Sequence, residues 1–210
     1  ESRCNETIII CKKYVIYEEL LMPQARVISD KQAKTIFTVI QQGRNPTRNA
    51  LVFALSYYAG MRAKEISSLN VSTFLTDDGK VREVIYLNAS MTKGKRGREV
   101  FLNSSVRQHL KKYIKELPTQ RCDVLIRPMG THNRFSANSL SIMLNNIYKR
   151  AGFDGCSSHS GRRSYATSLC QKGVSVRVIQ RLGGWSSIAS VMPYLDANEE
   201  MLKEAVELVS

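Results

Sequence analysis

The chain has few of the features that mark membrane, secreted or zinc-dependent proteins. None of its apolar runs approaches the ~20 residues that a membrane-spanning helix needs. The first residues, ESRCNETIIICKKYV, contain neither the apolar core nor the cleavage site of a signal peptide. The five cysteines are scattered and form no CxxC pair, which argues against a zinc site or a disulfide framework. We therefore expect a cytoplasmic protein with reduced thiols, no metal site and no membrane partner.

Acidic residues are scarce relative to basic ones. The 210 residues include 31 Lys and Arg but only 18 Asp and Glu, which gives a net charge of +13. Such an excess suits a polyanionic partner, because each neutralised phosphate releases condensed counterions. Charge alone does not distinguish DNA from RNA or from an anionic membrane surface. The hydrophobic fraction, 43%, is that of an ordinary globular protein, and the length is enough for one substantial domain.

The first half of the chain shows mainly helical periodicity. Ser29 is a good N-cap for a helix over about 30–42, in which apolar residues recur on one face. A second helix begins near Pro46 and is almost wholly apolar, so we expect it at the centre of the core. A third, short helix is expected over about 63–69.

Further helices are expected in the second half. Ser104 or Ser105 is predicted to cap a helix that reaches about 117, and Ser136 to open one that ends near 151. The remainder has the pattern of three or four short helices, the last over about 199–209.

Two segments alternate apolar and polar residues, over 81–87 and 98–102, and the TKGKRG run between them suits a hairpin loop. The predicted fold class is therefore mainly α with a small antiparallel β-sheet (α+β). Residues 1–25 are interpreted as an N-terminal arm or the remnant of a preceding region, and residues 26–210 as one domain.

A histidine and an arginine stand three residues apart in the segment HSGR. On a helix, this spacing places the His159 and Arg162 side chains on one face. A guanidinium can hold two phosphate oxygens, and an imidazole can accept or return a proton near neutrality. Taken alone, the motif is more typical of a capped helix with a solvated arginine.

Arg62 follows the buried helix, and Glu65 stands three residues after it. The pair is either a surface ion pair worth ~0.2–0.5 kcal/mol or a catalytic arginine that Glu65 orients.

The loop between the predicted strands is strongly basic, with Lys93, Lys95, Arg96 and Arg98. It is either a hairpin tip that only contacts phosphates or an arm that delivers one lysine as a general acid.

One tyrosine among nine stands in a position that favours contact with a ligand. Tyr194 follows Pro193 between two predicted short helices, whereas Tyr57 and Tyr58 belong to the apolar helix and are most simply core. A phenol has a pKa near 10 and is a poor nucleophile at neutrality, unless its neighbours favour the phenolate. Clustered arginines would do that.

The order of these motifs resembles the catalytic domain of the tyrosine recombinase (phage integrase) family over about residues 25–208. The matching segments are AGMR-AKEI, TKGKRGREVFL, HSGRRSYATSL, LGGW and PYLD. The separations between Arg162, Trp185 and Tyr194 also agree with that family's usual layout. The resemblance implies the integrase catalytic-domain fold and six active-site residues: Arg62, Lys93, His159, Arg162, Trp185 and Tyr194.

The resemblance also implies a role for each residue. Tyr194 would attack the scissile phosphate to give a 3′-phosphotyrosyl link and a free 5′-hydroxyl, with help from His159 in removing its proton. Two arginines would stabilise the charge on the phosphate, and Lys93 would protonate the leaving oxygen. Trp185 would buttress or hydrogen-bond the phosphate, and Glu65 would orient Arg62. The further DNA contacts expected are Lys95, Arg96, Arg98 and Arg163.

The implied reaction needs no ATP and no obligatory metal. The implied partners are double-stranded DNA, further copies of the chain that form a tetramer on DNA during synapsis, and accessory DNA-bending proteins. The expected location is the nucleoid.

The chain departs from the family's commoner pattern. Trp185 stands where histidine is usual, and an indole can donate one hydrogen bond but cannot shuttle protons. Pro193 restricts the residue before it and the approach of Tyr194. The family's helical DNA-clamping domain cannot be built from residues 1–25, so we expect a fragment or the end of a longer chain.

The resemblance therefore implies a site-specific DNA recombinase or integrase that integrates or excises a mobile element. Two alternatives remain at this point. The same chemistry suits a type IB topoisomerase or a telomere-resolvase-like enzyme. A basic DNA-binding regulator, in which the motif residues only contact phosphates, belongs to a different functional class.

Overall fold

The computed structural model describes residues 25–92, 96–117, 122–128 and 130–194, together with residues 203, 206 and 207. Several predictions fall outside these described residues. They concern Lys93 and Lys95, the N-terminal arm except for its last residue, and nearly all of the C-terminal helix predicted over about 199–209. In chain order the elements are α2 (Asp30–Gln41), α3 (Pro46–Tyr58), α4 (Ala63–Ser67), α5 (Val71–Phe74), β1 (Val84–Leu87), η1 (Ala89–Met91), β2 (Arg98–Phe101), α6 (Ser104–Glu116), α7 (Ala137–Arg150), α8 (Ser160–Gln171), α9 (Val176–Gly183) and η2 (Met192–Tyr194).

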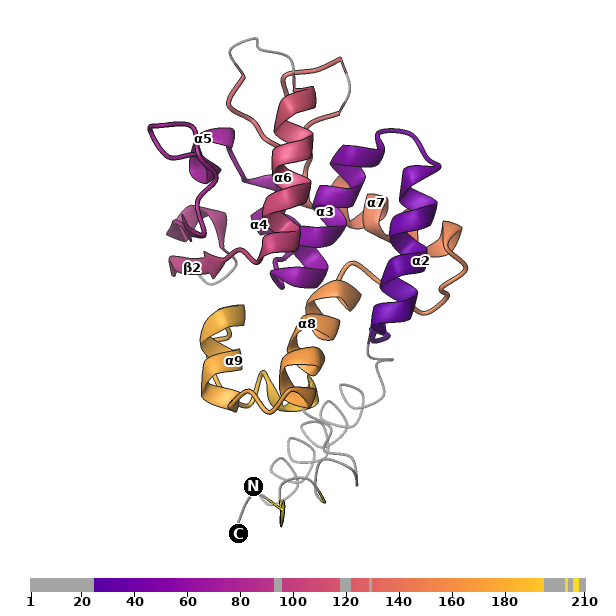
Figure 1. Ribbon diagram of the computed structural model, residues 1–210, viewed down its shortest axis with the longest axis vertical. Coiled ribbons are helices and arrows are strands. Elements are labelled where there is room, and N and C mark those ends of the chain that lie inside the picture. The colour runs from indigo at the N-terminus through magenta and orange to yellow at the C-terminus, as the bar shows by residue number, and fades with distance from the viewer. Residues whose placement is uncertain are drawn as a thin grey trace, which may run out of the picture.

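The core is centred on α3, as its apolar sequence predicts. Its residues from Ala50 to Leu55 are buried without interruption. The helix packs against α2, α6 and α8, so it is enclosed on several sides (Figure 1). In the part of the chain that is described, no helix is both long enough and apolar enough to cross a membrane.

The starts of α2, α6 and α7 follow capping residues. Ser29 caps α2 through a reciprocal pair of hydrogen bonds with Gln32, as predicted, and Ser136 caps α7. The prediction for α6 was wrong by one residue: the cap is Asn103, whose side-chain oxygen accepts from the Val106 amide at 2.9 Å. Asparagine caps as well as serine, so the chain uses the earlier of the available residues.

The two strands form an antiparallel pair, in a register that runs from Val84↔Phe101 to Leu87↔Arg98. The predicted class, mainly α with a small antiparallel sheet, is therefore confirmed. The first strand is shorter than the predicted 81–87, because Arg82 is held by the last residue of α5 and the residue after it. Its amide donates to the Phe74 carbonyl and its guanidinium donates to the Leu75 carbonyl.

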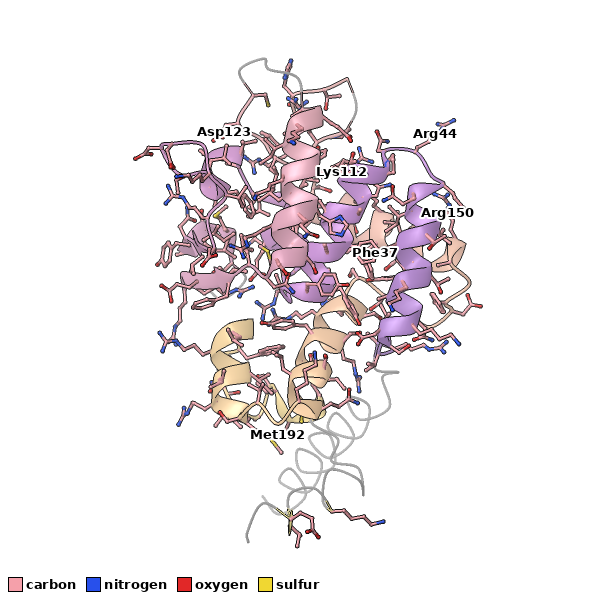
Figure 2. All side chains as sticks on the ribbon, viewed as in Figure 1. Phe37, Arg44, Lys112, Asp123, Arg150 and Met192 are labelled. Carbon is pink, nitrogen blue, oxygen red and sulfur yellow. The ribbon has the colours of Figure 1, made fainter. Side chains whose placement is uncertain are left out.

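A second, smaller cluster of buried residues lies between α8, α9 and η2. It contains Ala166, Ile179, Trp185 and Val191, and Tyr194 packs against it. In Figure 1, α8 and α9 stand below the larger group of helices. Figure 2 places Met192, two residues before Tyr194, at the lower side of this smaller group.

Candidate active site

Glu65 is the most deeply buried ionised group of the site. Its side chain is 0% exposed and accepts hydrogen bonds from two arginines. The Arg62 amide donates to Oε2 at 2.8 Å and the Arg62 guanidinium to Oε1 at 3.1 Å. Burial opposes ionisation of the carboxyl, but hydrogen bonds and charge from Arg98, aided by Arg62 and Arg162, hold its pKa below the ordinary value. The surface alternative for the Arg62–Glu65 pair is therefore excluded.

Arg162 occupies the first turn of α8 and joins the two groups of helices. Its guanidinium donates to the Gly60 carbonyl at 2.6 Å and to the Gly183 carbonyl at 2.7 Å, and the side chain lies almost entirely out of solvent. Its Cζ atom lies 4.0 Å from the centre of the Trp185 ring. Burial, followed by the positive charge of Arg62, lowers the pKa of Arg162, while Glu65 opposes the shift. The alternative of a solvated arginine in HSGR is also excluded.

The two glycines of LGGW allow this close packing. A Cβ atom on Gly183 would lie 1.6 Å from a carbon of the Trp185 ring, so only glycine lets the indole pass over the end of α9. Gly184 has φ +63°, the left-handed conformation of a helix C-cap, and its Cα faces the Arg98 stem. The two glycines of LGGW are therefore required because they let the Trp185 ring pack over the end of α9.

A cleft of about 230 Å³ lies between α4, α7 and α8. Its polar lining comes from three of the predicted catalytic residues and from four others: Arg62, Lys64, Asn138, Ser141, Ser158, His159 and Arg162. Arg62 is half-buried and His159 is exposed at the start of α8. Two guanidiniums and an imidazole therefore converge on one cleft, and all three ordinarily bind or protonate phosphate oxygens.

Tyr194 packs against the Trp185 indole, which in turn lies against Arg162. The centres of the Tyr194 and Trp185 rings are 5.6 Å apart, and the phenol interacts electrostatically with Arg162. Pro193 fits inside η2, whose backbone hydrogen bonds are donated by Met192 and Tyr194. The structure thus brings five of the six predicted residues into one contiguous region, and the sixth, Lys93, lies outside the described residues.

Arg163, which the sequence predicts as a DNA contact, also contacts the tyrosine segment. Its guanidinium donates to the Pro193 carbonyl at 3.4 Å and lies 5.7 Å from the centre of the Tyr194 ring. The hydroxyl of Thr167, one turn later on α8, donates to the Tyr194 carbonyl at 3.3 Å. These contacts tie the tyrosine to α8.

Arg98 was also expected to contact DNA, but its side chain is only 8% exposed and binds Glu65. Its Nε, Nη1 and Nη2 atoms all donate to Glu65 or to the Leu182 carbonyl, and Arg98, unlike Arg162, does not line the cleft. The alternation of the strand could have indicated this, because Arg98 shares a face with the buried Val100. Arg96, by contrast, is exposed, and its carbonyl accepts a hydrogen bond from Thr92 across the basic loop.

Lys64 is a cleft residue that the sequence analysis missed. Its ammonium donates to the Thr92 carbonyl at 3.3 Å, at the edge of the basic loop. The sequence could have indicated this role, because Lys64 lies between Arg62 and Glu65 on a predicted short helix. Within the described residues, no group of three or more His, Cys, Asp or Glu side chains is arranged to hold a metal ion.

The sequence pattern of the phage integrase family matches residues 26–201. Among curated relatives, the tyrosine recombinase XerA of Pyrococcus furiosus is 23% identical over 181 residues, which are 86% of this chain and 60% of that protein. A tyrosine recombinase of Thermosipho africanus is 29% identical over 164 residues, covering 78% of this chain and 54% of that protein. The chain spans about half to three fifths of the length of these relatives.

Solved structures share the fold. A crystal structure of XerA recombinase has a TM-score of 0.70 and 24% identity, and covers 90% of this chain and 67% of that one. The Tn1549 transposon integrase, in complex with transposon right end DNA, has a TM-score of 0.72 and 15% identity, with the same coverage of both chains.

Proposed function

Because the chain belongs to the phage integrase family, we propose that it forms the DNA-cleaving and rejoining part of a site-specific tyrosine recombinase. The observation that carries the proposal is that Arg162 connects the two parts of the protein site, the cleft and the Trp185–Tyr194 pair. This residue lines the cleft with Arg62 and His159, and it stacks on the indole that contacts Tyr194.

In the proposed reaction, the Tyr194 hydroxyl oxygen forms a bond to the scissile phosphorus, and the bond from phosphorus to the 5′-oxygen breaks. His159 assists the removal of the phenol's proton. Arg62 and Arg162 stabilise the extra charge on the non-bridging oxygens, a contribution for which loss of one donor typically costs 10²–10³-fold in rate. Lys93 supplies the proton to the leaving 5′-oxygen. Attack by a 5′-hydroxyl reverses these steps and rejoins the DNA.

Trp185 has a supporting part in this mechanism. Its ring lies on the Arg162 guanidinium and beside the Tyr194 ring, so it contacts both residues and helps to fix their positions. An indole cannot move protons, so proton transfer falls to His159 and Lys93. The aromatic face also favours a cation next to it.

The proposed partner is double-stranded DNA, and the proposed assembly is a tetramer of chains on two DNA duplexes during synapsis. Relatives of this fold have been solved with DNA, among them XerH with its difH substrate and a lambda integrase dimer on a core site. We further propose residues 26–210 as the catalytic domain, accessory DNA-bending proteins as partners, and the nucleoid as the location. The net charge of +13 suits this polyanionic partner.

Covalent capture on DNA tests the proposal. The probe is a pool of duplexes with a randomised central region and a nick in one strand, so that a short cleaved fragment diffuses away and traps the enzyme on the DNA. The native chain is expected to give an adduct that survives denaturing electrophoresis, and Tyr194→Phe is expected to bind the pool but give none. Tyr86→Phe, at an exposed tyrosine on β1, is the matched control and should behave like the native chain.

A native chain that binds the pool without forming any adduct would reject the enzyme and favour a DNA-binding regulator. If an adduct forms, the DNA products separate the remaining possibilities. Exchange of strands between two captured duplexes supports a recombinase. Relaxation of supercoiled DNA by a single chain, without exchange, would instead indicate a topoisomerase.

A further inference from the structure

Arg98 connects two segments of the site that are far apart in the sequence. Its Nη2 and Nε atoms donate to the two carboxylate oxygens of Glu65 at 2.9 and 3.2 Å. Its Nη1 atom donates to the Leu182 carbonyl at 2.9 Å, and its stem lies against Gly184. One guanidinium therefore holds α4 on one side and the end of α9 on the other.

Each side of this connection carries a proposed phosphate-binding residue. Glu65 also accepts hydrogen bonds from the Arg62 amide and guanidinium. Leu182 is followed directly by Gly183, whose carbonyl accepts from Arg162. A displacement of Arg98 would therefore change the separation of the two arginines that are to hold one phosphate.

We propose that Arg98 is a positioning residue, which sets Arg62 and the turn of Gly183–Trp185 at the spacing that the scissile phosphate requires. The inference rests on the proposed function. It assigns Arg98 to the geometry of the site and not to DNA contact, since its Nε, Nη1 and Nη2 atoms all donate to Glu65 or Leu182 and its side chain does not line the cleft. The planar fork of arginine suits this task, because it binds both carboxylate oxygens and still reaches the Leu182 carbonyl.

A role in fold stability alone would have different consequences. The loss of a merely stabilising ion pair lowers the unfolding temperature but leaves the folded molecules with a native site. The loss of a positioning residue changes the site within molecules that remain folded. The experiment therefore needs a probe of local geometry, and the chain has one, since Trp185 is its single tryptophan.

The first measurement is Trp185 fluorescence and its quenching by acrylamide, which requires no DNA. The ring is nearly buried in the native chain and packs over Gly183. Arg98→Met is expected to shift the emission to the red and to raise the quenching constant, with the helical circular dichroism kept. The matched control is Arg107→Met, which removes another arginine–glutamate pair, with Glu83, at the surface near the same hairpin. The control is expected to leave the emission unchanged.

The second measurement is the single-turnover rate of adduct formation on a duplex recovered by covalent capture, beside the dissociation constant for the same duplex. Arg98→Met is expected to lower the rate by about 100-fold, the usual consequence of displacing a reacting group by about 1 Å. The dissociation constant should change by less than the rate. Arg98→Lys is expected to recover part of the rate, because an ammonium still pairs with Glu65 but cannot bridge to Leu182.

A double substitution tests whether Arg98 acts through Glu65. In a Glu65→Gln background, Arg98→Met is expected to cost less than it does in the native chain, because the link to Arg62 is already weakened. This background also removes the buried carboxylate, so it remains informative if Arg98→Met alone fails to fold. The proposal is overturned if the loss of rate in the double variant equals the product of the losses in Arg98→Met and Glu65→Gln. It is also overturned if Arg98→Met keeps the native emission and the native rate.

The two measurements keep the inference separate from the proposed function. If the native chain forms no adduct, the proposed function fails, and the fluorescence of the Arg98 variants still decides whether this residue positions the turn. If adducts form at the native rate in Arg98→Met, the inference fails and the proposed function stands.

Discussion

The replacement of Gly183 by alanine tests whether the position of the Trp185 ring governs the reaction. A Cβ atom at residue 183 would lie 1.6, 2.1 and 2.4 Å from three carbons of the indole. Ordinary contact between carbon atoms is about 3.5–4.0 Å, so the ring must move by about 2 Å. The ring now lies 4.0 Å from the Arg162 guanidinium, so this movement breaks the stack.

The expected losses differ in size for stability and for reaction. Overpacking costs about 1–3 kcal/mol, and the better helix propensity of alanine offsets up to about 1 kcal/mol of that. The fold should therefore survive at a slightly lower unfolding temperature. The rate of adduct formation should fall by at least about 100-fold, because the displacement exceeds the 1 Å that commonly has this effect.

The assay combines Trp185 emission, thermal unfolding and single-turnover capture on nicked duplex. Gly173→Ala is the matched control, because Gly173 has φ +72° and its Cβ would meet no atom within 4 Å. Backbone strain there costs about 1–2 kcal/mol without touching the indole. Native emission and native rate in Gly183→Ala would refute the reasoning, and an equal loss of rate in both variants would attribute it to stability alone.

Three further changes have defined outcomes. Because the pKa of Glu65 is depressed in the folded state, its charge stabilises the fold above its unfolded pKa of about 4.3, and this contribution is lost as the pH falls through the folded value. In urea titrations, Glu65→Gln should therefore lower the unfolding free energy by about 3–5 kcal/mol at pH 7, with a deficit that shrinks in acid. Arg96→Ala should weaken DNA binding and reduce the slope of log affinity against log salt concentration by about 1. The control is Lys112→Ala, which should change neither quantity, because Lys112 lies on α6, far from α8 and α9 (Figure 2). Arg162→Lys should lower the capture rate by at least about 100-fold, because an ammonium cannot replace a guanidinium that binds two carbonyls and still faces phosphate.

The parts of the fold that follow from local signals could be predicted from the sequence. Ser29 and the apolar run after Pro46 each identify a helix, because capping and burial act within one segment. The start of β1 could not be predicted, since it depends on Arg82, which binds carbonyls of another segment. The four-residue helix α5 was missed for a similar reason: the Val71 amide at its start donates to the Asp123 carbonyl.

The motifs name candidate site residues, but the contacts that these residues make could not be predicted from the sequence. The order of motifs identified Arg62, His159 and Arg162, which the structure places around one cleft. The sequence shows that Arg98 and Arg163 are charged, but it does not show the buried carboxylate and the carbonyls that they meet. Both were therefore predicted as DNA contacts, and the structure adds that Arg98 binds Glu65 and that Arg163 donates to the Pro193 carbonyl.

The proposed reaction joins Tyr194 to DNA through a 3′-phosphate. The most direct test is to digest the captured adduct with protease and nuclease and to identify the modified peptide by mass spectrometry. We expect one nucleotide, linked through its 3′-phosphate to the Tyr194 hydroxyl, with the released strand carrying a free 5′-hydroxyl. A nucleotide on any other residue, or a linkage through a 5′-phosphate, would contradict the proposed reaction.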